Sequence, residues 1–105
     1  MENVKAKIEK FAELLHEDQV KFYNTEYPNY PDNCLSKSTE VHIKPGRKYT
    51  KVDLDTSGKY LVVNETGEIF GIKAYGVIHR GHAYGTLDTI NGWNWGGYTA
   101  TPRPL

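Results

Sequence analysis

The spacing of apolar residues changes once along this chain, and that change constrains the fold more than any other feature. In the first part, apolar residues recur every three or four positions; they are Val4, Ile8, Phe11, Leu14, Leu15 and Phe22. This spacing predicts an amphipathic helix over residues 3–24, which Pro28 prevents from continuing. From Thr39 onward apolar and polar residues alternate, and turn residues such as those at Pro45-Gly46 separate the runs. Alternation of this kind is typical of antiparallel strands.

We therefore expect an α+β fold, with an N-terminal amphipathic helix packed on a four- to five-stranded antiparallel, partly rolled β-meander. All ten glycines lie at Gly46 or later, which suits a strongly bent sheet. The Pro-containing, aperiodic segment 26–38 is predicted to be a loop, residues 39–98 the meander, and residues 99–105 an extended tail. A chain of 105 residues has room for a single core, so we expect one domain.

The charge balance argues against a partner selected by net charge. Thirteen basic residues face thirteen acidic ones, so no overall field attracts nucleic acid or an anionic membrane. The charges are unevenly spread: residues 1–40 hold eight acids and five lysines, whereas residues 41–105 hold five acids and eight basic residues. Cys34 is the sole cysteine, which excludes an intrachain disulfide and fits a reducing compartment. With neither a membrane-length apolar run nor a signal peptide in view, we expect a soluble cytoplasmic protein.

The stretch from Lys73 to Tyr98 carries most of the residues able to bind a ligand. Two similar tripeptides, 74–76 (AYG) and 83–85 (AYG), flank a segment that contains two histidines and an arginine. A turn at Gly81 would pair the tripeptides in one hairpin. That hairpin would gather Tyr75, His79, Arg80, His82 and Tyr84.

Three interpretations of this hairpin remain open. The first is an anion or nucleotide site, in which an arginine fork binds phosphate and aromatic faces stack on a base. Its predicted ligand-binding residues are Lys73, Tyr75, His79, Arg80, His82, Tyr84 and Trp93. The second is a metal site of two histidines and Asp88, which is disfavoured because strand residues three apart face opposite sides. The third is purely structural, with the polar groups satisfied locally; we assign no metal and no cofactor.

The tryptophans and the remaining polar residues add little towards catalysis. Trp93 and Trp95 occupy alternate strand positions, and we expect one in the core and the other at a contact surface. Cys34 has no histidine near it in sequence, and Asp53 with Asp55 is most simply a solvated turn pair. These residues favour a protein that is not an enzyme.

Four segments resemble small bacteriophage-encoded accessory proteins of unassigned function: Pro45–Val52 (PGRKYTKV), Ser57–Tyr60 (SGKY), Glu65–Ile69 (ETGEI) and Gly71–Gly76 (GIKAYG). The resemblance covers roughly residues 40–90. It implies a phage protein acting in the host cytoplasm by binding, for example by capturing a nucleotide signal or blocking a defence enzyme. It supplies no catalytic residues.

We therefore predict a non-enzymatic phage accessory protein, a host-defence antagonist that sequesters a small nucleotide or phosphorylated ligand. In this hypothesis Arg80, His79, His82 and Lys73 contact the phosphate, and Tyr75, Tyr84 or Trp93 stacks on the base. One alternative is a protein–protein inhibitor that docks on a host enzyme through its acidic helix or its tryptophan face. Another is binding of single-stranded nucleic acid on the sheet face, which the neutral net charge disfavours. A homo-oligomer suits either of the first two.

Overall fold

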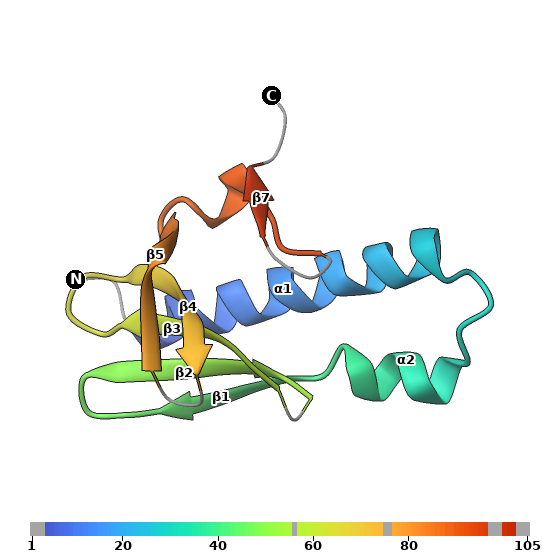
Figure 1. Ribbon diagram of the computed structural model, residues 1–105, viewed down its shortest axis with the longest axis horizontal. Coiled ribbons are helices and arrows are strands. Elements are labelled where there is room, and N and C mark those ends of the chain that lie inside the picture. The colour runs from blue at the N-terminus through green and yellow to red at the C-terminus, as the bar shows by residue number, and fades with distance from the viewer. Residues whose placement is uncertain (1–3, 56, 75–76, 97–99, 103–105) are drawn as a thin grey trace.

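The computed structural model describes residues 4–55, 57–74, 77–96 and 100–102 (Figure 1). Of residues 57, 73, 74, 77, 79 and 80 only the backbone is described. The helices are α1 (Val4–Glu26), α2 (Asp32–Ser38) and the short 3-10 helix η1 (Ile90–Gly92). The strands are β1 (Val41–Pro45), β2 (Tyr49–Leu54), β3 (Ser57–Val63), β4 (Glu68–Ala74), β5 (Val77–Thr86), β6 (Trp93–Asn94) and β7 (Thr101–Pro102).

The predicted α+β fold is confirmed. Strands β1 to β5 form one antiparallel sheet in the order β1-β2-β3-β4-β5, so each strand pairs with its neighbour in the sequence. The sheet is bent by a bulge between β2 and β3 and by several register shifts between β4 and β5, and it stays open. Helix α1 runs along one face of the sheet (Figure 1).

Three boundaries differ from the sequence prediction, and the first lies between helix and sheet. The segment predicted as a loop contains α2, which follows Pro31 and ends where the Thr39 hydroxyl and N–H both bond to the Leu35 carbonyl, at 2.8 and 3.0 Å. No residue of α2 is buried, so it carries no apolar stripe that periodicity could detect. Helix α1 itself ends at Glu26, two residues before Pro28.

The other two differences concern the C-terminal third. The main sheet ends at Thr86 rather than extending to residue 98, because the chain then turns through η1. Trp93 and Asn94 pair instead with Pro102 and Thr101 in a separate two-stranded sheet. The described part of the predicted tail is therefore extended but paired.

The core lies between α1 and the inner face of the sheet. Three residues of α1, Ile8, Phe11 and Leu15, are at most 4% exposed. They belong to one cluster with Val52, Leu54, Tyr60, Val62, Ile69, Tyr84, Leu87, Ile90, Trp95 and Ala100. Burial of this apolar stripe stabilises α1 despite the like charges of its exposed Glu9, Glu13 and Glu17.

Trp95 lies at the centre of this core and is fully buried. Its ring centroid lies 4.6 Å from that of Phe11 and 5.3 Å from that of Tyr60, both in edge-to-face geometry. Trp93 is half-buried beside it, with the two indole centroids 6.1 Å apart. Hence one of the two tryptophans is a core residue, as expected.

Side chains of α1 hold the backbone around Trp95. The Asp18 carboxylate accepts the Trp95 N–H at 2.9 Å, and the Gln19 amide donates to the Trp95 carbonyl at 2.8 Å. The indole N–H donates to the Ile90 carbonyl at 2.9 Å. A Cβ at Gly96 would lie 2.6 Å from the Asp18 carbonyl, so this close approach requires glycine.

The opposite face of the sheet has a smaller apolar centre. Leu61 pairs with Phe70, and the two residues are 2% and 6% exposed although neither belongs to the main cluster. Asp53 lies in β2 and is buried, so its assignment to a solvated turn pair is wrong. Lys44 of β1 contacts its carboxylate at 3.2 Å, and burial lowers the pKa of Lys59 in β3.

Replacing Trp95 with Ala should lower the free energy of unfolding by about 3–5 kcal/mol, because the substitution leaves a large cavity and removes the ring contacts. Replacing the half-buried Trp93 with Ala is the matched control and should cost less. Urea unfolding followed by far-UV circular dichroism measures both. Equal losses would contradict the central place of Trp95 in the core.

Candidate functional site

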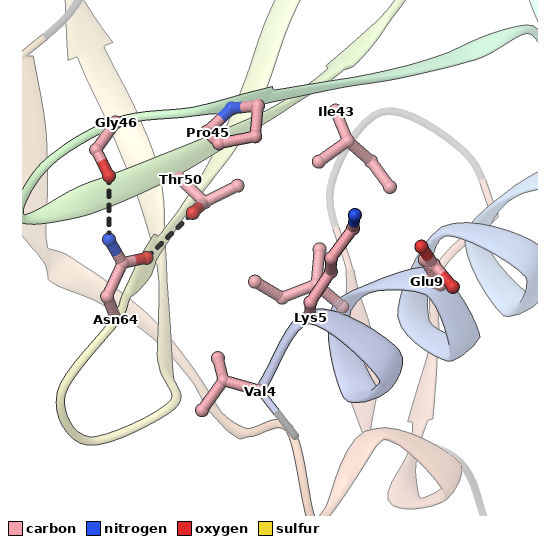
Figure 2. Close-up of a pocket in the computed structure, with 9 residues that line it drawn as sticks. Val4, Lys5, Glu9, Ile43, Pro45, Gly46, Thr50 and Asn64 are labelled. Atoms are coloured by element: carbon pink, nitrogen blue, oxygen red, sulfur yellow. Dashed lines mark hydrogen bonds between the residues drawn. The ribbon is translucent and has the colours of Figure 1, made fainter.

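A groove opens between the first two turns of α1 and the inner face of the sheet at its β1–β2 end. Its volume is about 550 Å³, and we call it the N-terminal groove (Figure 2). Its apolar wall is formed by Val4 and Ile8 of α1 and by Ile43 and Pro45 of β1. The groove falls in the size range of small-molecule sites, which are mostly apolar with a few polar groups.

The polar end of the groove is built by Asn64, the residue that follows β3. Its side-chain amide donates to the Gly46 carbonyl at 2.9 Å, and its Oδ1 accepts the Thr50 hydroxyl at 2.7 Å (Figure 2). The Asn64 N–H also donates to the Lys48 carbonyl at 3.1 Å. Asn64 thereby joins the β3–β4 turn to the β1–β2 hairpin, and this end of the groove is held in place.

Glycine is needed at the hairpin turn that borders the groove. A Cβ at Gly46 would collide with the Tyr49 carbonyl. The turn can therefore stay tight only with glycine at this position. The next residue, Arg47, is exposed at the same end of the molecule.

Charged side chains border the groove on the helix side. Lys5 rises from α1 toward Ile43, and Glu9 lies one turn further along the helix (Figure 2). Glu9 is the one carboxylate among the described residues that line the groove, and no His or Cys lines it. The lining thus offers shape, apolar surface and one cation, but no base–nucleophile pair.

The residues predicted to bind a ligand are only partly placed. Tyr75 lies outside the described residues, as do the side chains of Lys73, His79 and Arg80, whose backbones lie in β4 and β5. His82, Tyr84 and Trp93 are described and form a row. Ring centroids are 6.5 Å apart for His82 and Tyr84, and 5.6 Å apart for Tyr84 and Trp93. None of the three lines the N-terminal groove.

The predicted turn at Gly81 is wrong. Gly81 lies inside β5, and the connection between β4 and β5 falls at residues 75–76 instead. Gly71 pairs with His79 whereas the adjacent Phe70 pairs with Ala83, so the register shifts across residues 80–82 of β5. A Cβ at Gly71 would lie 3.2 Å from that of His82, and this close approach explains the glycine in β4.

Tyr84 is a core residue. It is 8% exposed and lies among Tyr60, Trp93 and Trp95, with centroid distances of 5.5, 5.6 and 6.1 Å. Burial raises the pKa of its phenol. It therefore has no free ring face for stacking on a base, whereas His82 is exposed and Trp93 is half-buried.

Comparisons with family models, curated proteins and solved structures find no match for this chain. Among the described residues, no three His, Cys, Asp or Glu side chains cluster as metal ligands would. The helices, in so far as they are described, are too short or too polar to cross a membrane. Function therefore has to be argued from the groove and the surface.

The sequence did not indicate the groove. Val4 and Ile8 belong to the predicted apolar stripe, and Ile43 to the predicted inner face of the sheet. The spacing of apolar residues predicts that all three lie in the core. It does not predict that the helix and the sheet leave a space between them. Residue type predicts turns at Pro45-Gly46 and at Asn64. It does not predict that these two turns contact each other.

Unfolding should become easier above about pH 10, the ordinary pKa of tyrosine. Burial, with a smaller effect from Tyr84, raises the pKa of Tyr60 well above that value, so the folded chain keeps a proton that the unfolded chain releases. Stability is then full below pH 10 and falls as the pH rises. Lys59 has the opposite effect. Because its pKa is lowered in the folded chain, its contribution to stability rises with pH up to 10.5, the ordinary pKa of lysine.

Urea midpoints measured between about pH 10.5 and 11.5 test this expectation. The midpoint of the wild type should fall across this range, and that of Tyr60→Phe should fall less. The variant also loses the bond that its hydroxyl accepts from Ala100, so its midpoint should be lower than that of the wild type below pH 10. Parallel curves for the two proteins would contradict the assignment to Tyr60.

Proposed function

We propose that this protein is a non-enzymatic binding protein that holds a small nucleotide or phosphorylated ligand in the N-terminal groove. The observation that carries the proposal is the groove itself, about 550 Å³ in volume, walled by apolar side chains and closed at one end by Asn64. Pre-formed concave sites with few polar groups are the usual places for small ligands.

The lining determines what kind of ligand fits. An apolar or planar body, such as a base, would pack between Ile8 and Ile43, where it removes apolar surface from water. Asn64 and Thr50 bond mainly to each other and to the hairpin, so they shape the site more than they bind. An anionic group would face Lys5 at the mouth, with Arg47 exposed beyond Gly46.

A retained ligand is detected by native mass spectrometry of the protein purified from cells, read beside its denatured mass and its absorbance ratio at 260 and 280 nm. The proposal expects a discrete extra mass that denaturation removes. The same spectrum gives the subunit number and so tests the predicted homo-oligomer.

Replacing Ile43 with Trp should fill the groove and abolish ligand retention, and Lys5→Glu should weaken retention by reversing the charge at the mouth. Lys10→Glu is the matched control, since Lys10 is exposed on α1 and does not line the groove. ¹⁵N NMR titrations with AMP and with adenosine measure binding directly. We expect AMP to shift the amide signals of Ile8, Ile43 and Asn64 more strongly than adenosine does.

Two results would overturn the groove as the site: a bare mass with no shift from either probe, or AMP binding that Ile43→Trp leaves unchanged. The first would remove the ligand altogether. The second would move the ligand to another part of the molecule.

A second location for the same ligand is the bulged part of β5. The register between β4 and β5 shifts across residues 80–82, and a bulge of this kind commonly re-aims side chains next to binding sites. Gly81 and His82 are exposed there. Arg80, at the start of the bulge, is the phosphate-binding residue that the sequence predicts.

Replacing Arg80 with Ala should, if this location is used, abolish ligand retention while leaving the melting temperature nearly unchanged. Native mass spectrometry and thermal unfolding measure the two quantities, and Ile43→Trp should then keep the ligand. Loss of the fold in Arg80→Ala would instead make Arg80 a structural residue. The roles as a phage accessory protein and host-defence antagonist remain proposals that rest on the resemblance.

A further inference from the structure

The last two turns of α1 hold no fully buried residue. Gln19 is the last buried residue of the helix, yet the helix continues for two more turns, and α2 has no buried residue at all. The end of α1 and the segment that follows it carry an aromatic cluster, which we call the aromatic corner. It consists of Phe22, Tyr23, Tyr27 and Tyr30.

The rings of the aromatic corner pack on one another. The Tyr23 centroid lies 5.0 Å from that of Tyr30 and 5.8 Å from those of Phe22 and Tyr27. Tyr27 is 54% exposed, the highest exposure of a large aromatic side chain in the described part of the chain. Exposed aromatic groups of this kind are enriched at protein interfaces, where tyrosine contributes much contact area for little lost entropy.

Hydrogen bonds hold the corner in one shape. The hydroxyls of Tyr30 and Ser38 are bonded at 3.0 Å, which ties the corner to α2. His16 Nδ1 donates to the Thr39 carbonyl at 2.8 Å, which ties α2 back to α1. A surface ordered before binding loses less entropy when a partner docks.

A cavity of about 270 Å³ adjoins the aromatic corner through Phe22. Asp18, Glu26 and Lys21 line it, together with Asn94 from β6. Segment 16–38 as a whole holds four carboxylates and two lysines. The corner and its cavity thus combine one exposed ring and three half-buried rings with a net negative charge.

We infer that the aromatic corner is a docking surface for a protein segment that presents an arginine side chain next to apolar residues. The guanidinium would enter the cavity beside the Glu26 carboxylate and lie against the ring of Phe22, which favours arginine because its planar cation stacks on aromatic faces. The apolar neighbours of that arginine would contact Tyr27 and Tyr23. This surface lies at the opposite end of α1 from the N-terminal groove. The inference is therefore independent of the proposed ligand.

An NMR titration with two matched peptides tests this inference. The probes are acetyl-Leu-Arg-Leu-amide and the same peptide with citrulline, which keeps the shape of arginine without its charge. The arginine peptide should shift the amide signals of residues 21–30 and of Asn94. The citrulline peptide should bind about threefold to tenfold more weakly, the loss expected for removing a cation from an aromatic and acidic site.

Two variants and a control make the test specific. Tyr27→Ala and Glu26→Lys should each weaken binding of the arginine peptide at least about threefold, because one removes an exposed ring and the other reverses a lining charge. Glu13→Lys makes the same charge change on the exposed face of α1 away from the cavity, and it should keep the affinity. Tyr27→Ala should also keep the melting temperature, since that side chain is more exposed than buried.

Three outcomes would overturn the inference. Equal binding of the two peptides would show that charge is not recognised. Shifts confined to the sheet or to the N-terminal groove would place the peptide elsewhere. No shift with either peptide would show that the corner does not take an arginine side chain.

Discussion

The hold of α1 on Trp95 is the interaction on which the C-terminal third depends. After β5 the described residues form only the short η1 and a two-stranded sheet with two residues on each side. A ladder of that size is marginal alone. The buried Trp95 holds this sheet in place. Its backbone N–H and carbonyl bond to Asp18 and Gln19, two adjacent polar residues of α1 that are themselves buried. Buried polar groups cost free energy unless they are paired, and here each pairs with the backbone beside Trp95.

The main features of the fold could be predicted because they depend on spacing. The change from a helical to an alternating period predicts one helix and a meander, and Phe11 with Leu15 falls on the buried face as expected. Gly71 is one of the glycines that suit a strongly bent sheet, and it lies at a register shift. Features that depend on tertiary contact were missed. Helix α2 has no fully buried residue, and its end is held by Thr39, which bonds to Leu35 and to His16, contacts that no periodicity reports.

The candidate site could be predicted less well than the fold, for a related reason. Sequence reasoning gathered polar and aromatic residues by assuming a turn at Gly81, whereas the strand continues through that glycine and bulges. Tyr84 then faces the core instead of solvent. Residue type had marked Tyr84 as a stacking group, but a buried tyrosine uses the same ring to fill volume. The apolar residues that line the groove are ordinary core types. Their role depends on where α1 lies against the sheet, which sequence spacing does not specify.

Both surface features follow from a mismatch of lengths. A helix of 23 residues is about 35 Å long, whereas strands of five to seven residues, such as β1 to β3, extend about 16–23 Å. Since α1 runs along the sheet, it cannot bury its whole length against these strands (Figure 1). Its middle, from Ile8 to Gln19, packs on the core; its first turns border an open groove, and its last turns extend beyond the sheet and carry aromatic rings. A helix that only covered the sheet could be about a third shorter. We therefore expect the extra turns at the two ends of α1 to take part in binding.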